Sequence, residues 1–405
     1  MDIRSHFPAL EQIVYGKKLI YFDNAATSQK PRSVLDLQEK ISGGTNANIH
    51  RAVHKLSADA TMLYEEGREA VRKFINAESD KEVVFTSGTT AGFNLLATCF
   101  SQAFLTAGDK VVISEAEHHS NIVPWQIACA RCGAELVVAP IAKNGRLDIE
   151  QYEKLLDAKV KLVSVTHVSN VLGVVNPIEQ VIEIAHSKGI PVAIDGAQGI
   201  VHTKVDVQKL DCDFYLFSGH KIYAPTGIGI LYGNQKWLEA MPPFFGGGDM
   251  VDTVTFEKTT YASLPLKFEA GTPNFTAAAC FAPAMEFATQ MRESEEVSDN
   301  ERKMTEYLFE NLQNTEGVHL CAESADIDCK VPLFSMWFDS AHPTDVAQLI
   351  DKMGVAVRSG LMCAEPLVRK FSDKGLLRAS LMPYNTMDEC EAFIEKLRRA
   401  LTILR

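Results

Sequence analysis

The stretch 190-IPVAIDGAQGIVHTKVDVQKLDCDFYLFSGHKIYAPTGIGILYG-233 decides the fold. Its apolar runs at 190–195, 212–217 and 227–233 are predicted to be buried strands. Asp195 ends the first run, and Lys221 follows the second within the sequence SGHK. Because parallel sheets place their chemistry at the carboxyl ends of the strands, we expect this carboxylate and this amine at one edge of a sheet.

The same alternation begins near residue 80 and predicts a large α/β domain. Four more apolar runs are predicted strands, at 82–86, 110–114, 134–140 and 160–167. Helical patterns such as 91–104 and 177–189 lie between them. Strands that alternate with helices indicate βαβ units. We therefore expect a mainly parallel seven-stranded sheet with both faces covered, in a large domain over residues 21–280.

The pattern changes near residue 281, where steady alternation stops. One long helical pattern is followed by a mixture of strands and helices, at 280–312, 331–338, 344–354, 356–360, 376–382 and 387–404. Such a mixture predicts a smaller α+β domain over 281–405. Residues 1–20 are expected to form an N-terminal segment associated with this small domain.

Composition excludes several classes of protein. The formal net charge is -12 and no Lys/Arg run is present, which argues against a nucleic-acid binder. No apolar stretch has the length of a signal peptide core or a membrane span, so no membrane contact is expected. The nine cysteines are scattered and odd in number, which favours reduced thiols and a cytoplasmic location. Cys129 and Cys132 lack a second pair for zinc and are predicted to be packed helix residues.

Two further polar clusters follow predicted strands. In 87-SGTT-90, Gly and hydroxyl residues at a helix N-terminus predict an anion site, without the pattern of a nucleotide loop. In 117-EHH-119, the paired histidines suggest either a metal or a ring that stacks on a flat cofactor. No third ligand stands at a recognisable spacing, so no metal is expected.

Pyridoxal phosphate requires all four of these features in one place. Its phosphate needs an anion site, its ring a stacking face, its pyridine nitrogen an acid and its aldehyde a lysine. Taken singly, Asp195 could instead cap the next helix, and Lys221 could be an ordinary lysine. Their combination favours a pyridoxal-phosphate enzyme.

Eight ordered motifs resemble the SUF-type cysteine desulfurases, which are fold-type-I enzymes like the class-V aminotransferases. The resemblance runs almost end to end. The motifs are NxHRxxHxLS from Asn48, GTT at 88–90, E-HH-x-NIVPW from Glu117, THVSNVLG from Thr166, DGAQ from Asp195, FSGHK-x-Y-x-P-T-G-I-G-I-L-Y from Phe217, EAGTPN from Glu269 and RAS-x-x-x-YNT from Arg378.

The resemblance implies a role for each residue of the cofactor site. Lys221 would hold the aldehyde and later move the proton at the substrate Cα. Asp195 would pair with the pyridine nitrogen, Gln198 with the phenolic oxygen, and the catalytic His118 would stack on the ring. Phosphate contacts are implied for Thr89, Thr90, Ser218, His220 and, in the neighbouring subunit of a homodimer, Thr272.

The resemblance also implies a substrate pocket and a nucleophile. Arg378 would bind the substrate carboxylate, a fork geometry that lysine does not reproduce. Asn170, His50 and Arg358 would line the pocket, and His119 is expected to pack beside it. Cys363 would attack the sulfur of L-cysteine, because a thiolate is the soft nucleophile that this step needs and the nearby Arg358 favours the thiolate. The products are L-alanine and a persulfide on Cys363.

Three positions depart from the family pattern. Leu361 and Met362 stand where histidine commonly precedes the catalytic cysteine, which leaves open how the thiolate is activated and how an acceptor docks. Ala91 replaces the usual Glu after GTT, with an expected effect on loop or dimer contacts. Arg378 follows Cys363 closely, which predicts a short loop to which the acceptor must come.

Two other functions remain open at this point. One is a selenocysteine lyase or another pyridoxal-phosphate C–S lyase, in which Cys363 would be dispensable for sulfur release. The other is a pyridoxal-phosphate-binding assembly scaffold without turnover. The expected partners are L-cysteine, with L-selenocysteine as the alternative, a sulfur-acceptor protein for iron-sulfur cluster or thio-cofactor assembly, and a second copy of the chain.

Overall fold

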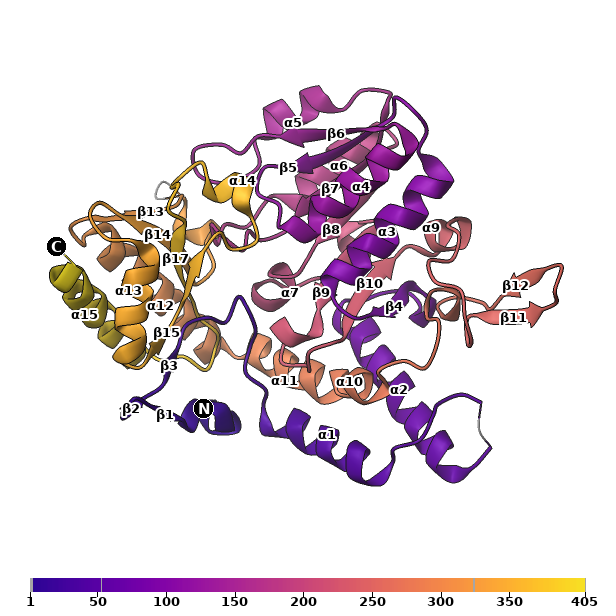
Figure 1. Cartoon of the computed structure of the whole chain (residues 1–405), viewed down its shortest axis with the longest axis horizontal. Coiled ribbons are helices and arrows are strands. Elements are labelled where there is room, and N and C mark those ends of the chain that lie inside the picture. Colours follow the sequence, from indigo (N-terminus) through magenta and orange to yellow (C-terminus); the bar gives the residue numbers. More distant parts are fainter. Residues whose placement is uncertain (1–2, 52, 323–324, 405) are drawn as a thin grey trace.

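Two β-sheets organise the chain (Figure 1). The computed structural model describes residues 3–51, 53–322 and 325–404. One sheet has seven strands, and the other, near the C-terminus, has four. Within the described residues, no helix combines the length and the apolar character needed to cross a membrane.

The seven-stranded sheet confirms the predicted fold class. Its order is β4-β10-β9-β8-β7-β5-β6. The strands are β4 Val83–Thr86, β5 Lys110–Ser114, β6 Glu135–Ala139, β7 Val160–Thr166, β8 Val192–Asp195, β9 Phe214–Ser218 and β10 Gly229–Gly233. Strands β5 to β9 pair in parallel, and β10 runs antiparallel to β4 and β9. The connection from β9 to β10 is too short for a crossover helix, so β10 must return antiparallel.

Both faces of this sheet are buried under helices. Val83 and Phe85 point into a core shared with α2 and α11, whereas Val84, between them, points into a second core with α3 and α4. This alternation explains why the strands are almost continuously apolar. The helices are α1 Arg32–Gly44, α2 Lys55–Phe74, α3 Thr89–Phe104, α4 Val123–Cys132, α5 Ile149–Leu155, α6 Ile178–Ser187, α7 Gly199–His202, α8 Val207–Leu210, α9 Gln235–Ala240, α10 Phe275–Ala279 and α11 Phe281–Glu293.

The four-stranded sheet is antiparallel, in the order β13-β14-β17-β16. Its strands are β13 Val318–Leu320, β14 Leu333–Phe338, β16 Arg358–Gly360 and β17 Leu376–Ser380, and it packs with α12 Glu295–Gln313, α13 Pro343–Lys352 and α15 Met387–Leu404. Leu377 and Ala379 face these helices. Since side chains alternate along a strand, Arg378 between them faces the other way, toward the large sheet.

The long helical pattern at 280–312 is two helices rather than one. Helix α11 ends at Glu293, and Ser294 caps α12 by accepting a hydrogen bond from the Val297 amide. Phe281 and Met285 of α11 pack in the core of the large sheet. The predicted boundary at residue 281 therefore falls inside that core, and we propose that the division lies at Ser294.

The N-terminal segment contacts both parts of the chain. Strand β3 Ile20–Tyr21 pairs in parallel with β15 Val355–Ala356, and Arg4 lies 2.7 Å from Glu389 of α15. Phe7, however, packs against Tyr223 and Phe287 of the large core. The segment therefore connects the two cores. A small hairpin, β1 Ile13–Val14 with β2 Lys17–Lys18, lies between these contacts.

Candidate active site

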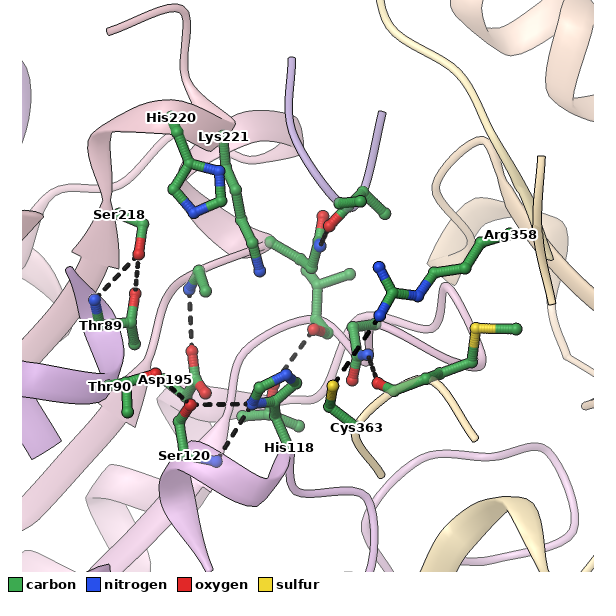
Figure 2. Close-up of a pocket in the computed structure, with 18 of the residues that line it drawn as sticks. Thr89, Thr90, His118, Ser120, Asp195, Ser218, His220, Lys221, Arg358 and Cys363 are labelled. Carbon is green, nitrogen blue, oxygen red and sulfur yellow. Dashed lines mark hydrogen bonds between the residues drawn. The ribbon is translucent and has the colours of Figure 1, made fainter. Parts of the chain in front are cut away.

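One cavity of about 220 Å³ between the two sheets collects the predicted site residues (Figure 2). Large-sheet loops and the β16–β17 region both contribute to its wall. The predicted residues that line it are Thr89, Thr90, His118, Asn170, Asp195, Gln198, Ser218, His220, Lys221, Arg358, Cys363 and Arg378. Lys221 and Cys363 thus face the same cavity, although they lie far apart in the sequence.

Lys221 is a buried amine with a lowered pKa. It lies in a 3-10 turn, Gly219–Lys221, directly after β9. Burial lowers its pKa to about 8, while the negative charge of Asp195 opposes the shift. A lysine with a lowered pKa has a larger neutral fraction near pH 7, and the neutral amine is the form that attacks a carbonyl.

Asp195 is buried at the carboxyl end of β8. One of its oxygens accepts a hydrogen bond from the Ala197 amide at 2.9 Å, and its second oxygen makes no hydrogen bond within the described residues. Burial raises its pKa, and Lys221 opposes this shift. The alternative role as a helix cap is wrong, because α7 begins at Gly199 and Gln198 occupies its N-cap position. The Gln198 amide donates to the Ala25 carbonyl at 2.8 Å.

The N-terminus of α3 forms the predicted anion cradle. Gly88, its N-cap, has a φ of 145°, which favours glycine. The Thr89 amide donates to Ser218 Oγ at 2.9 Å, and the Thr90 and Ser120 hydroxyls lie 2.6 Å apart. The first amides of a helix and these hydroxyls are donors suited to a phosphate.

His118 is held as a neutral ring. Its Nδ1 accepts a hydrogen bond from the Ser120 amide at 3.1 Å. Burial, with the nearby Lys221 charge, lowers its pKa to about 3. The residues that the structure describes contain no group of three ligands suited to a metal ion. Ser120, which connects the ring to Thr90, was not identified from the sequence, although it directly follows the histidine pair.

Cys363 is exposed on a short segment between β16 and α14 Glu365–Val368. Arg358 Nη2 lies 3.9 Å from its Sγ atom. Met362 and Cys363 both have left-handed backbone angles, with φ of 52° and 53°. Two such non-glycine residues in succession are strained, so the surrounding contacts must hold them in place.

The apolar residues before Cys363 anchor this segment. Met362 is 3 % exposed and packs in an apolar cluster with Val171, Leu172 and Leu367, and Leu361 packs against the same cluster. The Asn170 side chain donates to the Met362 carbonyl at 2.9 Å. Where the family commonly has histidine, this chain therefore uses hydrophobic packing to fix the position of the thiol.

His119 holds the same segment on both sides of the thiol. Its amide donates to the Cys363 carbonyl at 2.7 Å, and its Nε2 accepts a hydrogen bond from the Glu365 amide at 3.0 Å. From the sequence, His119 is expected to pack beside the pocket. These contacts make His119 a positioning residue for Cys363. No local sequence pattern reveals this role, because the two residues lie far apart in the chain.

We expect His119→Ala to lower kcat about tenfold and to change KM less than about twofold, because the loss of the acceptor leaves the Glu365 amide unpaired and loosens the thiol. Steady-state kinetics with L-cysteine check this split. His119→Gln offers an acceptor oxygen and should recover most of the rate. An alanine variant with unchanged kcat would contradict the positioning role.

Arg378 is fully buried and only partly paired. Nη1 donates to the Asn170 carbonyl at 3.0 Å, and Nη2 donates to Asp23 Oδ1 at 3.2 Å. Its Nε is buried and has no hydrogen-bond partner among the residues that the structure describes. The guanidinium is thus oriented by two neighbours and keeps a free donor. Asp23 was not identified from the sequence, although it follows the short apolar run 20-IYF-22.

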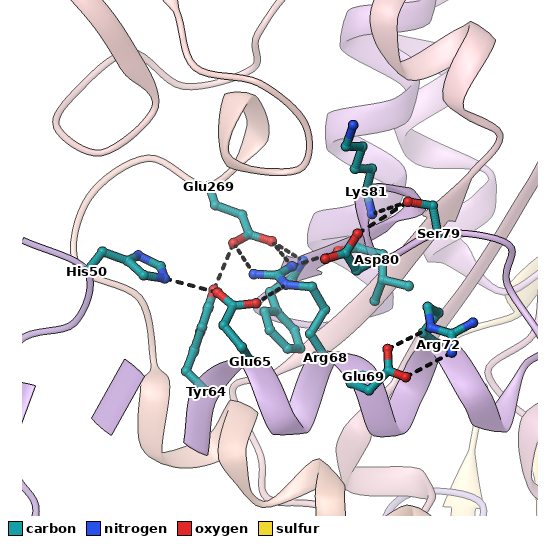
Figure 3. A network of polar contacts seen from close by, with 12 residues as sticks. His50, Tyr64, Glu65, Arg68, Glu69, Arg72, Ser79, Asp80, Lys81 and Glu269 are labelled. Atoms are coloured by element: carbon teal, nitrogen blue, oxygen red, sulfur yellow. Dashed lines mark hydrogen bonds and ion pairs between the residues drawn. The ribbon is translucent and has the colours of Figure 1, made fainter. Parts of the chain in front are cut away.

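Two predicted residues lie outside the cavity of their own chain. His50, before α2, lies 3.0 Å from Glu65, which belongs to the buried Arg68–Glu269 network (Figure 3). Thr272 is exposed on the loop before α10. Within one chain, neither residue contributes to the site.

The chemistry of the remaining residues fits pyridoxal phosphate. The cradle at α3 suits a phosphate, and the free oxygen of Asp195 suits a protonated pyridine nitrogen. The buried Lys221 amine suits an aldehyde. The unpaired Arg378 Nε offers a donor to the carboxylate of an amino acid.

Comparisons with known proteins agree with this geometry. The family Aminotransferase class-V matches residues 20–393. A probable cysteine desulfurase of Vibrio cholerae is 43% identical over 402 residues, which cover 99% of this chain and 98% of the relative. A cysteine desulfurase of Cronobacter sakazakii is 44% identical over 404 residues, covering 100% of this chain and 98% of that protein.

Solved structures show the same similarity. The cysteine desulfurase CsdA of Escherichia coli, solved in an S-sulfonic acid form, matches with a TM-score of 0.89 at 36% identity over 99% of this chain and 98% of the other. The apo cysteine desulfurase of Thermococcus onnurineus NA1 matches with a TM-score of 0.91 at 34% identity over 98% and 99% of the two chains.

Proposed function

The chain belongs to the class-V aminotransferase family and is a cysteine desulfurase that uses pyridoxal phosphate; we propose that Lys221 and Cys363 act on the two ends of one bound L-cysteine. The observation that carries this proposal is that the buried amine and the exposed thiol line a single cavity.

In this proposal the substrate is oriented by its carboxylate. Arg378 binds that group, and Asp23 and Asn170 hold the guanidinium in place. Thr89, Thr90, Ser218 and His220 hold the cofactor phosphate, while Asp195, Gln198 and His118 contact its ring. When bound there, pyridoxal phosphate supplies an electron sink for the bond changes at Cα.

The protein residues then move one proton and one sulfur atom. The neutral Lys221 amine takes the Cα proton. The Cys363 thiolate attacks the substrate sulfur, so a sulfur–sulfur bond forms and the carbon–sulfur bond breaks, with its electron pair left on carbon. Protonation of that carbon, together with return of the proton from Lys221 to Cα, gives L-alanine, and the sulfur remains as a persulfide on Cys363.

We further propose that the enzyme is a homodimer in which His50 and Thr272 reach the cavity of the partner subunit. Both residues lie outside their own cavity. Phe245, which is largely exposed, lines a hollow together with Ala270 and Pro273, close to Thr272 in the sequence. Phe256, between β11 Val251–Val254 and β12 Thr259–Tyr261, is exposed as well. Ala91, which stands where the family usually has Glu, lines a mostly apolar hollow there with Phe244 and Phe245. Exposed apolar patches of this kind support a protein contact.

The sulfur acceptor is proposed to come to the enzyme. The segment between β16 and α14 is short and anchored, and Cys363 is exposed on it. A persulfide held in this way has little reach, so a partner thiol must approach it. All nine cysteines are free thiols. This supports the proposal that the enzyme acts in a reducing compartment such as the cytoplasm.

Mass spectrometry of the purified holoenzyme tests the proposed function. After incubation with L-cysteine, the peptide that carries Cys363 should gain one sulfur atom, and L-alanine should appear in equal amount in the first turnover. The other cysteine peptides serve as internal controls and should stay unmodified. Alanine formation with no sulfur on Cys363 would refute the mechanism and favour a lyase that releases sulfide directly.

A further inference from the structure

A second cavity, of about 410 Å³, lies behind the turn that carries Lys221. Ile222 and Tyr223, the two residues after the lysine, form part of its wall. The rest comes from the end of α2, the α7 region, α11, the start of α12 and Pro383. The two cavities have no lining residue in common, so this space is separate from the active site.

Three polar side chains line this cavity without a hydrogen-bond partner among the described residues. The His202 side chain is 6 % exposed, and Tyr223 is 3 % exposed. Glu301 Oε1 is buried and unpaired. The closest approach between two of them, from His202 Nδ1 to Glu301 Oε1, is 3.9 Å, which is too long for a hydrogen bond. Buried polar groups are nearly always paired, so a ligand is the natural partner for this set.

The same wall holds an unpaired cation and an unpaired anion. Arg292 lies over the Phe74 ring and donates one hydrogen bond to the Ile200 carbonyl, but among the described residues no carboxylate pairs with it. Among the described residues, no lysine or arginine pairs with Glu301. Burial raises the pKa of Glu301 to about 7. Arg292, Glu301 and Tyr223 all line this cavity.

We propose that this cavity is a second binding site, specific for a small zwitterion such as a free amino acid. Its carboxylate would pair with Arg292 and its ammonium group with Glu301, while His202 and Tyr223 supply further hydrogen bonds. A simple anion would leave Glu301 unpaired, and a simple cation would leave Arg292 unpaired. Phe74, Met291 and Val297 offer apolar surface for a side chain.

Calorimetric titration of the holoenzyme tests this site. The probes are L-leucine, L-glutamate and L-arginine, which lack sulfur and differ in side-chain charge. We expect at least one to bind with a Kd below about 1 mM, and its deaminated acid and decarboxylated amine to bind about tenfold more weakly or worse. Arg292→Gln and Glu301→Gln should each weaken that binding about tenfold or more. Lys73→Gln, which removes an exposed charge at the rim, is the matched control and should change it less than about threefold.

Two further measurements separate this site from the catalytic cavity and from misfolding. Binding of the probe should survive Arg378→Gln, which removes the residue that binds the substrate carboxylate in the active site. If Arg378→Gln abolishes binding and Arg292→Gln does not, the probe binds in the active site and the proposal is overturned. A crystal of the wild-type holoenzyme soaked with the tightest probe should show density in the second cavity. If that density shows only water, or if no probe binds to the wild type, the proposal is overturned. Both measurements use the wild-type protein, so they do not depend on whether a variant folds.

Discussion

Lys221→Ala is expected to lower desulfurase turnover by at least about 10³-fold. The variant loses the amine that takes the Cα proton, and general-base groups contribute about 10² to 10⁴ in rate. It also loses the covalent attachment point of the cofactor. Burial lowers the pKa of this amine to about 8, so its neutral, proton-accepting form is more abundant near pH 7 than that of an ordinary lysine. Alanine formation from L-cysteine under saturating conditions measures the loss.

Lys330 provides the matched control for this substitution. It is a buried lysine whose pKa burial lowers to about 7, and it donates to the Leu172 and Leu333 carbonyls outside the catalytic cavity. Lys330→Met removes a buried amine of the same kind and should keep most of the turnover per folded molecule. A Lys221→Ala enzyme with more than about a tenth of wild-type turnover would exclude Lys221 as the base.

Cys363→Ala should abolish persulfide formation and lower alanine production by at least about 10³-fold. The thiolate is the group that accepts the sulfur, and without it the carbon–sulfur bond has no nucleophile to take the sulfur away. Substrate binding through Arg378 should remain, so the KM for L-cysteine should change little. Parallel assays of alanine and total sulfide, with a reductant present, measure the effect.

Cys132→Ala is the control for the loss of a partly exposed thiol. Cys132 lies on α4, and its Sγ contacts the Cys129 carbonyl rather than the cavity. It should retain wild-type activity. If Cys363→Ala instead keeps full sulfur release, the enzyme acts as a C–S lyase, and the selenocysteine-lyase alternative becomes the better description.

Much of the fold follows from local sequence patterns. The seven strands of the large sheet are short apolar runs, and their continuous hydrophobicity reflects burial on both faces. Asp195 and Lys221 were identifiable because Asp195 ends one such run and Lys221 follows another within SGHK. Gly133, with a φ of 75°, ends α4 as its position predicts. The division proposed at Ser294 rests on packing alone, because α11 packs in the core of the large sheet.

The sequence by itself determined most of the elements and the residue types of the cofactor pocket, since these depend on residue type and short spacing. The candidate nucleophile Cys363 was identified only through the resemblance to the cysteine desulfurases. The tertiary structure alone decided that His119 clamps the Cys363 segment, that Asp23 orients Arg378, and that Met362 is an anchor. It also decided that His50 and Thr272 lie outside their own cavity. The period of apolar residues along the sequence indicates which face of a helix or strand is buried. The contacts of His119, Asp23 and Met362 instead join residues far apart in the chain, and they form only when the two cores pack together.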